Sequence, residues 1–250
     1  MPKPPLYFLL LAMSLGAAHA AGAGAPARPR FDHYLLALSL APAFCEDRPQ
    51  AKRRLAQCRE LTRRAAPTLS LHGLWPNNAR QPHPEHCAGE AGGGFCRLPA
   101  LPLPAELRGR LAYAMPGTAD CLDRHEWAKH GSCSGLGPVD YVDWSIRLAG
   151  RVERALGPAL RRAQGGEVSL ASLLSTLRRV DPALAAATGF DCRTPRTPDP
   201  VKRRPMLTEV RVRFAVGPDG VPGRPLPLAH PGQHNSGCPG GRAWVDAPDD

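Results

Sequence analysis

The amino-acid sequence predicts one α+β domain that is held together by disulfides. Segments with strand periodicity and segments with helical periodicity both occur, and their spacing is that of hairpins and separate helices rather than of βαβ units. About 230 residues remain after an N-terminal leader, which suits one compact domain with a real core. Eight cysteines, an even number, suit a disulfide framework in an exported chain.

The chain opens with a segment typical of a secretory signal peptide. Lys3 supplies a short positive region, residues 6–15 are mostly apolar, and Ala18-His19-Ala20 fits the small-x-small cleavage rule. We therefore expect residues 1–20 to be a signal peptide and residues 21–250 to form the mature catalytic domain. The apolar run is too short to span a bilayer and no later stretch is apolar enough. We expect an exported, periplasmic or extracellular protein with no membrane partner.

The first half of the mature domain contains two predicted strands and a predicted helix. Residues 31–40 form the first strand, and residues 68–72 alternate so that the leucines face the core and His72 faces the other way. The turn residues Pro76-Asn77-Asn78 are expected to end that second strand. A loop rich in Pro and Gly follows from 81 to 104, and residues 104–115 are expected to form a helix with Pro in its first turn.

The second half is predicted to contain three helices and one clear strand. A long amphipathic helix is expected from about Asp140, because apolar residues recur at the helical period: Val142, Ile146, Leu148, Val152 and Leu156. Ser169 and Asp181 are predicted N-caps of two further helices. Residues 208–216 alternate, with Val210, Val212, Phe214 and Val216 on one face and Glu209, Arg211 and Arg213 on the other. The last thirty residues, rich in Gly and Pro, are expected to be loop-like.

The net charge is strongly positive. It is +10 for the whole sequence and falls to +9 without residues 1–20, which contain one Lys and no acid. Such a charge favours attraction to a polyanion, most naturally a nucleic acid, although solubility or adhesion to an anionic cell envelope would explain it equally.

Residues 120–133 concentrate ionisable groups in one short segment, Asp-Cys-Leu-Asp-Arg-His-Glu-Trp-Ala-Lys-His-Gly-Ser-Cys. If the segment is helical, His125 and Lys129 are i,i+4 neighbours, as are Glu126 and His130, so all four side chains leave from one side. Gly131 would then end the helix in a left-handed conformation. This pattern predicts a catalytic helix.

Three other interpretations compete with a catalytic helix. Mixed charges at i,i+4 spacing often form only a solvated face. A zinc helix of the zincin type would need a second His at i+4 from His125, but Lys129 occupies that position, so no metal is expected. Two histidines with purely structural roles are the third interpretation, and a second polar segment upstream weighs against it.

That second segment is His72-Gly73-Leu74-Trp75-Pro76. Together with His125–Cys133 it resembles the two active-site segments of the ribonuclease T2 family of secreted ribonucleases. The resemblance extends from about Phe31 to the region of Cys238 and is strongest to bacterial periplasmic members. It implies a central antiparallel sheet with flanking helices.

The resemblance also implies pairs for the cysteines, which by count alone allow 105 pairings. Family-like pairing joins Cys87 to Cys133 and Cys192 to Cys238. The other four cysteines can pair in three ways, and of these we expect Cys45–Cys58 with Cys96–Cys121, although the sequence does not fix this choice. A Cys87–Cys133 bond would link the loop after His72 to the end of the helix that carries His130. A zinc site of four thiolates is the alternative, but the sequence has no Cys-x-x-Cys spacing.

The chemistry of ribose explains why two histidines and a cation suffice. RNA supplies its own nucleophile, so a base for the 2′-hydroxyl proton and an acid for the 5′-oxygen are needed, with stabilisation of the phosphorane charge. The resemblance implies that His130 is the base and His72 the acid. His125, Glu126 and Lys129 would bind phosphate, and Trp75 and Asn77 would hold a base. The expected reaction is metal-independent and cofactor-free cleavage of single-stranded RNA to 2′,3′-cyclic phosphates and then to 3′-phosphates.

Two positions depart from the family pattern. Leu40 stands where family members usually have Trp, and Leu122 stands where an aromatic residue often lines a second base site. We therefore expect low base specificity, unless a loop supplies another aromatic ring. The remaining histidines match no catalytic pattern and are expected on the surface or in loops: His33, His83, His86, His230 and His234. We expect a monomer without an obligate protein partner.

Two other classes of function compete with a ribonuclease. A basic secreted protein that only binds RNA would be expected to lack one catalytic imidazole, yet His72, His125 and His130 are all present. A metal-dependent nuclease or phosphodiesterase would be expected to have clustered carboxylates, whereas the catalytic segments contain a single Glu.

Overall fold

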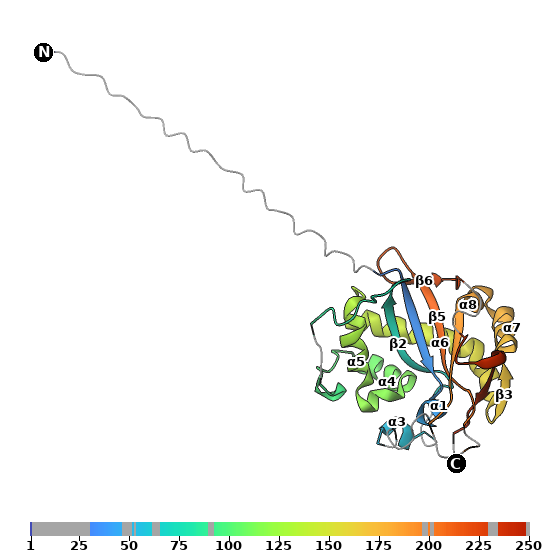
Figure 1. The fold of residues 1–250 in the computed structure, drawn as a ribbon. Coiled ribbons are helices and arrows are strands. Elements are labelled where there is room, and N and C mark those ends of the chain that lie inside the picture. Colours follow the sequence, from blue (N-terminus) through green and yellow to red (C-terminus); the bar gives the residue numbers. More distant parts are fainter. Residues whose placement is uncertain are drawn as a thin grey trace.

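Helices pack around one twisted sheet, which confirms the predicted α+β class (Figure 1). The computed structural model describes residues 1, 31–46, 52, 54–61, 66–89, 93–196, 200, 203–229 and 235–248. Apart from Met1, the predicted signal peptide lies outside these residues, as do His230 and His234. None of the helices in the described ranges has the length and apolarity needed to cross a membrane.

The sheet contains eight strands among the described residues, in the order β2-β1-β5-β4-β7 with β3, β6 and β8 attached to this path. Their bounds are β1 His33–Ser39, β2 Ser70–Asn77, β3 Gly166–Ser169, β4 Thr188–Arg193, β5 Met206–Val216, β6 Pro222–Pro225, β7 Asn235–Ser236 and β8 Arg242–Val245. The pairs that join β2, β1, β5 and β4 are antiparallel, as expected. Strands β7 and β8 instead pair in parallel with β4 and β5.

The prediction of a loop-like C-terminal region was wrong in part. Strand β8 pairs with β3 and β5 in that region, and Ala243 and Val245 are buried while Arg242 is exposed. Four residues surrounded by Gly and Pro are too few for a convincing alternation, so the core contacts decide this strand.

Helices and short 3₁₀ turns lie between several of the strands along the chain. The helices are α1 Ala41–Glu46, α3 Ala56–Arg59, α4 Ala105–Ala114, α5 Leu122–Lys129, α6 Pro138–Ala163, α7 Leu170–Val180 and α8 Pro182–Ala186. The 3₁₀ turns are η1 Phe95–Arg97, η2 Pro116–Asp120, η3 Gly131–Cys133 and η4 Pro239–Gly241. Helix α6 begins with Pro138 at its first turn, slightly earlier than expected. Asp181 caps α8 through the Leu184 N–H, whereas Ser169 precedes α7 without a side-chain capping bond.

The core lies between one face of the sheet and the long helix α6. Tyr34, Leu36 and Leu38 of β1 are fully buried, and so are the apolar residues Val210, Val212 and Phe214 of β5. Val152, Leu156 and Leu160 of α6 are buried with them, which agrees with the predicted apolar stripe. The opposite face of β1 carries Leu35, Ala37 and Ser39, and this face is where the polar residues of β2 and β5 meet.

A β-bulge in β2 controls the direction of His72. Ala37 of β1 pairs with Gly73 and the next residue, Leu38, pairs with Leu71, so His72 is the extra residue without a partner on β1. In a regular strand, residues three apart point to opposite faces. The bulge shifts this phase, so that Leu71 and Leu74 both enter the core while His72 and Trp75 lie on the same side, with ring centroids 5.2 Å apart.

The end of α5 differs from the prediction. Gly131 is not in a left-handed conformation; it begins η3 directly after His130. A Cβ on Gly131 would collide with the rings of Trp127 and Tyr141, so glycine is required there for close packing. Tyr141 also donates a hydrogen bond to the Leu74 carbonyl oxygen, 2.9 Å, which ties α6 to β2.

Four disulfides join the described cysteines, two in the pairs that the family resemblance implies and two in the pairs expected for the remaining four cysteines. They are Cys45–Cys58, Cys87–Cys133, Cys96–Cys121 and Cys192–Cys238. The Cys87–Cys133 bond holds the loop that follows β2 against η3, immediately after α5. Two segments distant in sequence are therefore cross-linked beside the site.

Candidate active site

The centre of the site is a contact between β2 and α5. The Trp75 indole N–H donates to Glu126 Oε2 at 2.7 Å, and His72 Nε2 lies 3.7 Å from Glu126 Oε1. The Trp75 ring contacts two imidazoles, since the ring centroids of His72 and His130 both lie 5.2 Å from its own. Glu126 is only 3% exposed, whereas the His72 side chain is 32% exposed. The buried Glu126 carboxyl of α5 therefore contacts both Trp75 and His72 of β2.

The helix α5 places the other predicted residues at the same point. His125 and Lys129 lie one turn apart, as do Glu126 and His130, and His130 ends the helix. Lys129 Nζ lies 3.4 Å from Glu85 Oε1 in the loop after β2. The His86 N–H donates to the Lys129 carbonyl oxygen at 2.8 Å, which holds this loop against the helix end.

The second ring nitrogen of His72 is held by a residue that sequence reasoning did not assign to the site. His72 Nδ1 donates to Glu209 Oε1 of β5 at 2.7 Å. The Arg211 guanidinium in turn binds Glu209 Oε2 through Nε and Nη2, at 2.9 and 2.7 Å, and binds Asp191 of β4 through Nη1 at 2.7 Å. The only sequence signal for Glu209 and Arg211 was the charged face of the strand at 208–216. That pattern does not indicate which residues the face contacts.

The two central histidines have opposite protonation tendencies. Burial lowers the pKa of His72, but the hydrogen bond to Glu209 and the negative charges of Glu126 and Glu209 outweigh burial, so the pKa is raised above 6.5. Burial and the positive charges of Lys129, His125 and His72 lower the pKa of His130 to about 3. The buried His130 Nδ1 has no hydrogen-bond partner among the described residues, which further disfavours a charged ring. His72 favours the charged form and His130 the neutral form.

Burial also governs the two remaining central groups. It raises the pKa of Glu126, although the charge of His72 and the hydrogen bond from Trp75 oppose this. Burial and the charge of Lys129 lower the pKa of His125. An uncharged carboxyl group can donate a hydrogen bond to an anion, whereas a carboxylate would repel the anion.

A pocket of about 370 Å³ collects all seven residues that the sequence analysis assigned to the site. They are His72, Trp75 and Asn77 of β2 and, from α5 and its end, His125, Glu126, Lys129 and His130. His83, Glu85 and Arg211 line it as well. The side chain of Asn77 is buried, and its Oδ1 accepts the Asn78 N–H at 2.9 Å.

One of the unassigned histidines lies elsewhere than expected, and another takes part in the pocket. His33 is on β1 and is 5% exposed, because the strand continues into the sheet face beside β2. His83 lies in a loop, as expected, but it lines the pocket, and its Nδ1 accepts the Asn78 N–H at 3.2 Å. The turn after β2 folds back over the site, which spacing along the chain does not reveal.

A second pocket of about 320 Å³ adjoins the first and shares only His72 and His125 with it. Phe95 of η1 stacks on the His125 ring there, with centroids 4.0 Å apart and an interplanar angle of 15°. Leu122 and Phe44 also line this pocket. A loop thus supplies an aromatic ring close to Leu122, the position at which the sequence lacks one.

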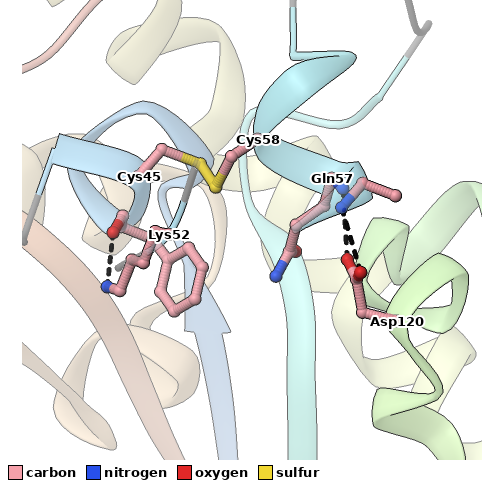
Figure 2. Close-up of a disulfide and its surroundings, with 7 residues drawn as sticks. Cys45, Lys52, Gln57, Cys58 and Asp120 are labelled. Atoms are coloured by element: carbon pink, nitrogen blue, oxygen red, sulfur yellow. Dashed lines mark hydrogen bonds between the residues drawn. A yellow bond between two sulfur atoms is a disulfide. The ribbon is translucent and has the colours of Figure 1, made fainter. Parts of the chain in front are cut away.

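The N-terminal part of the domain lines this second pocket with Phe44, Leu55 and Gln57. Figure 2 shows the contacts that hold this part in place. The Cys45–Cys58 disulfide joins α1 to α3, and the Asp120 carboxylate accepts the N–H groups of Ala56 and Gln57 at 2.9 and 3.2 Å. Asp120 ends η2, just before α5 begins at Leu122, so the start of α5 is tied to the wall of the pocket.

Fold and pockets together define a disulfide-bonded α+β protein with a paired-imidazole site. No group of three or more His, Cys, Asp or Glu residues that could hold a metal ion occurs in the described part of the chain. The chain belongs to the ribonuclease T2 family, which matches residues 31–216.

Individual relatives include bacterial proteins. The chain is 32% identical over 166 residues to ribonuclease I of Escherichia coli, covering 56% of this chain and 62% of that protein. It is 34% identical over 115 residues to a ribonuclease of Aeromonas hydrophila, covering 44% and 41%. The matches thus span less than two thirds of each of these relatives.

Solved structures share the fold. Ribonuclease MC1 from bitter gourd seeds has a TM-score of 0.57 at 20% identity, covering 85% of this chain and 99% of that one. RNase NT, solved in complex with 5′-AMP, has a TM-score of 0.58 at 17% identity, covering 88% and 98%. At such identities the similarity concerns the fold alone.

Proposed function

We propose that this protein is an endoribonuclease that cleaves single-stranded RNA by acid–base catalysis between His130 and His72. The observation that carries the proposal is that one pocket holds two imidazoles with opposite protonation tendencies. The pKa of His72 is raised above its ordinary value, and the pKa of His130 is lowered below it. Membership of the ribonuclease T2 family supports the same activity.

In the first step, neutral His130 accepts the proton of the 2′-hydroxyl, whose oxygen attacks the adjacent phosphorus. Charged His72 donates a proton to the departing 5′-oxygen, and a 2′,3′-cyclic phosphate forms. In the second step the roles reverse: His72 accepts a proton from water and His130 donates one to the 2′-oxygen, which leaves a 3′-phosphate. Each step returns the histidines to the protonation states that the next one needs.

The other residues of the pocket stabilise charge on the phosphorane. Lys129 supplies a cation, and His125 supplies a ring N–H at the junction of the two pockets. Glu126, whose pKa is raised by burial, supplies a hydrogen-bond donor when neutral. The reaction needs no metal ion and no cofactor.

The arrangement of the two pockets suits a phosphodiester between two nucleosides. We propose that Trp75 and Asn77 hold one base in the first pocket and that Phe95 stacks on the other in the second. Stacking on an aromatic ring tolerates any base, because every base has a π-face. A missing ring near Leu122 is therefore not the reason for low base specificity; the reason is that Phe95 stacks without distinguishing the bases. An exported monomer acting on RNA outside the cytoplasm fits the predicted signal peptide and the four disulfides.

The decisive experiment compares RNA and DNA strands of the same sequence in EDTA, at about pH 5 to 7, where histidine titrates. RNA is expected to be cleaved to fragments with 2′,3′-cyclic phosphate ends, identified by mass spectrometry. DNA, which lacks the 2′-hydroxyl, is expected to bind and remain intact. Inhibition by EDTA or equal cleavage of DNA would contradict the mechanism, and RNA binding without cleavage would favour a binding protein.

Glu85 is expected to weaken substrate binding, because its carboxylate forms an ion pair with Lys129, the cation that the phosphate needs. The change Glu85→Gln is expected to lower KM for RNA by about two- to five-fold and leave kcat nearly unchanged, the range expected for an exposed ion pair. Steady-state kinetics at low ionic strength measure this.

The matched control for Glu85→Gln is Glu106→Gln on α4, which changes the net charge equally but lies outside both pockets. An equal fall of KM in both variants would mean that the effect is overall charge rather than competition at Lys129.

A further inference from the structure

On the Nδ1 side of His72, an acid, an arginine and a second acid form a continuous chain, whose arginine also lines the first pocket. It runs from Glu209 of β5 through Arg211 to Asp191 of β4. Glu209 is 15% exposed, and the contact between its carboxylate and His72 Nδ1 joins residues 137 positions apart. Arg211 holds Glu209 through two hydrogen bonds to the same oxygen.

The sheet explains how Glu209 reaches His72. Strand β1 lies between β5 and β2, so the two residues are two strands apart, roughly 9 to 10 Å across the sheet. The residues of β1 that lie between them on this face are small: Ala37, opposite Arg211 and Gly73, and Ser39, opposite Glu209 and Ser70. Glu209 has a side chain long enough to cross above these small residues, and the bulge displaces His72. The two side chains can therefore meet.

We infer that Glu209 is a positioning residue for the general acid, which fixes the His72 ring through Nδ1 and directs Nε2 towards the scissile phosphodiester. The inference rests on the proposed function for its role in catalysis. With Nδ1 committed to Glu209, only Nε2 remains to exchange a proton with the substrate, and Nε2 is the atom that faces Glu126 in the pocket. Arg211 and Asp191 hold Glu209 in turn, so a chain of three residues orients His72, the general acid.

The charges around His72 agree with this role. The ionisable groups that face it are Glu209 and Arg211 from β5 and His125, Glu126, Lys129 and His130 from α5. Burial and the charge of Arg211 disfavour a proton on His72, whereas the hydrogen bond to Glu209 and the negative charges of Glu126 and Glu209 favour it. Burial works to raise the pKa of Glu209, but His72 and Arg211 lower it to about 2, so Glu209 remains an anion throughout the working range.

The test is an NMR titration that measures the pKa of the His72 imidazole in Glu209→Gln, without substrate. Glutamine keeps the shape and can still accept a hydrogen bond, but it removes the charge. The pKa of His72 is expected to fall by about one unit or more, the lower end of the effect of an adjacent opposite charge. Since a general acid must be protonated, the alkaline limb of the pH–rate profile is expected to move to lower pH by the same amount.

The variant Glu209→Asp separates charge from reach. Aspartate keeps the charge but is one methylene shorter, so it cannot cross β1 to His72. It is expected to lower kcat by about ten-fold or more with little change in KM, as expected when orientation is lost. Glu167→Gln on β3, a strand carboxylate paired with Arg242, is the matched control and is expected to change neither quantity.

Near-UV circular dichroism establishes whether each variant is folded, and Glu209→Asp keeps the inference testable if Glu209→Gln is not. A His72 titration that is the same in Glu209→Gln and in the unaltered protein would overturn the inference, as would full activity of Glu209→Asp. Failure of the unaltered protein to cleave RNA would refute the proposed function separately, because the NMR titration does not depend on turnover.

Discussion

Replacement of His130 by alanine is expected to lower kcat for RNA by a factor of about 10² to 10⁴, the contribution of a positioned general base. The ring is half-buried at the end of α5, and its low pKa keeps it neutral and ready to accept the 2′-hydroxyl proton. His72→Ala is expected to cause a loss of the same order, because the leaving oxygen then departs without a proton.

The pH dependence distinguishes the two roles. Activity should fall as pH decreases through the pKa of His130, since the charged ring cannot accept a proton, and should fall as pH rises through the raised pKa of His72. The residual rate of His130→Ala is therefore expected to lack the acid limb, and that of His72→Ala the alkaline limb. Each variant serves as the control for the other, and the opposite result would exchange the two roles.

Bound substrate is expected to move the acid limb. The positive groups around His130 lower its pKa in the free protein, and a phosphodiester in the pocket offsets those charges. The profile of kcat/KM reports the free protein and that of kcat the complex. The acid limb of kcat should therefore lie at higher pH than that of kcat/KM.

The second large effect is expected for Gly73→Ala. A Cβ at this position would overlap Glu126 Oε2 and Trp75 Nε1, the two atoms that form the central hydrogen bond of the site. Either Glu126 or Trp75 must move, and a displacement of about 1 Å at such a site can lower the rate by about 10²-fold. We expect kcat to fall by about that factor, with a decrease in the melting temperature.

The control for this variant is Gly109→Ala in α4, where a Cβ meets no atom within 4 Å. Alanine in an exposed helix interior is expected to raise the stability by about 0.5 to 1 kcal/mol relative to glycine and to leave the kinetics unchanged. If Gly73→Ala kept full kcat, the contact between Glu126 and Trp75 would have no part in catalysis.

Much of the site could be predicted because its spacing is local. The i,i+4 relations among His125, Glu126, Lys129 and His130 follow from 3.6 residues per turn, so a helix alone brings these four side chains together. The strand at 206–216 was similarly predictable, since its buried and exposed residues alternate with a period of two. Family resemblance, not local spacing, identified the segment around His72 as the partner of this helix and supplied two of the four cysteine pairs.

What only the tertiary structure decided depends on contacts between segments distant along the chain. The alternation around 68–72 placed His72 on the polar face of its strand, but the extra residue opposite Ala37 and Leu38 is a property of the pairing with β1, and it alone brings Trp75 to the same side. Glu209 and Phe95 reach the histidines from another strand and from a loop. Periodicity reports which face of an element is apolar, whereas the partner of a polar side chain is set by how the elements pack.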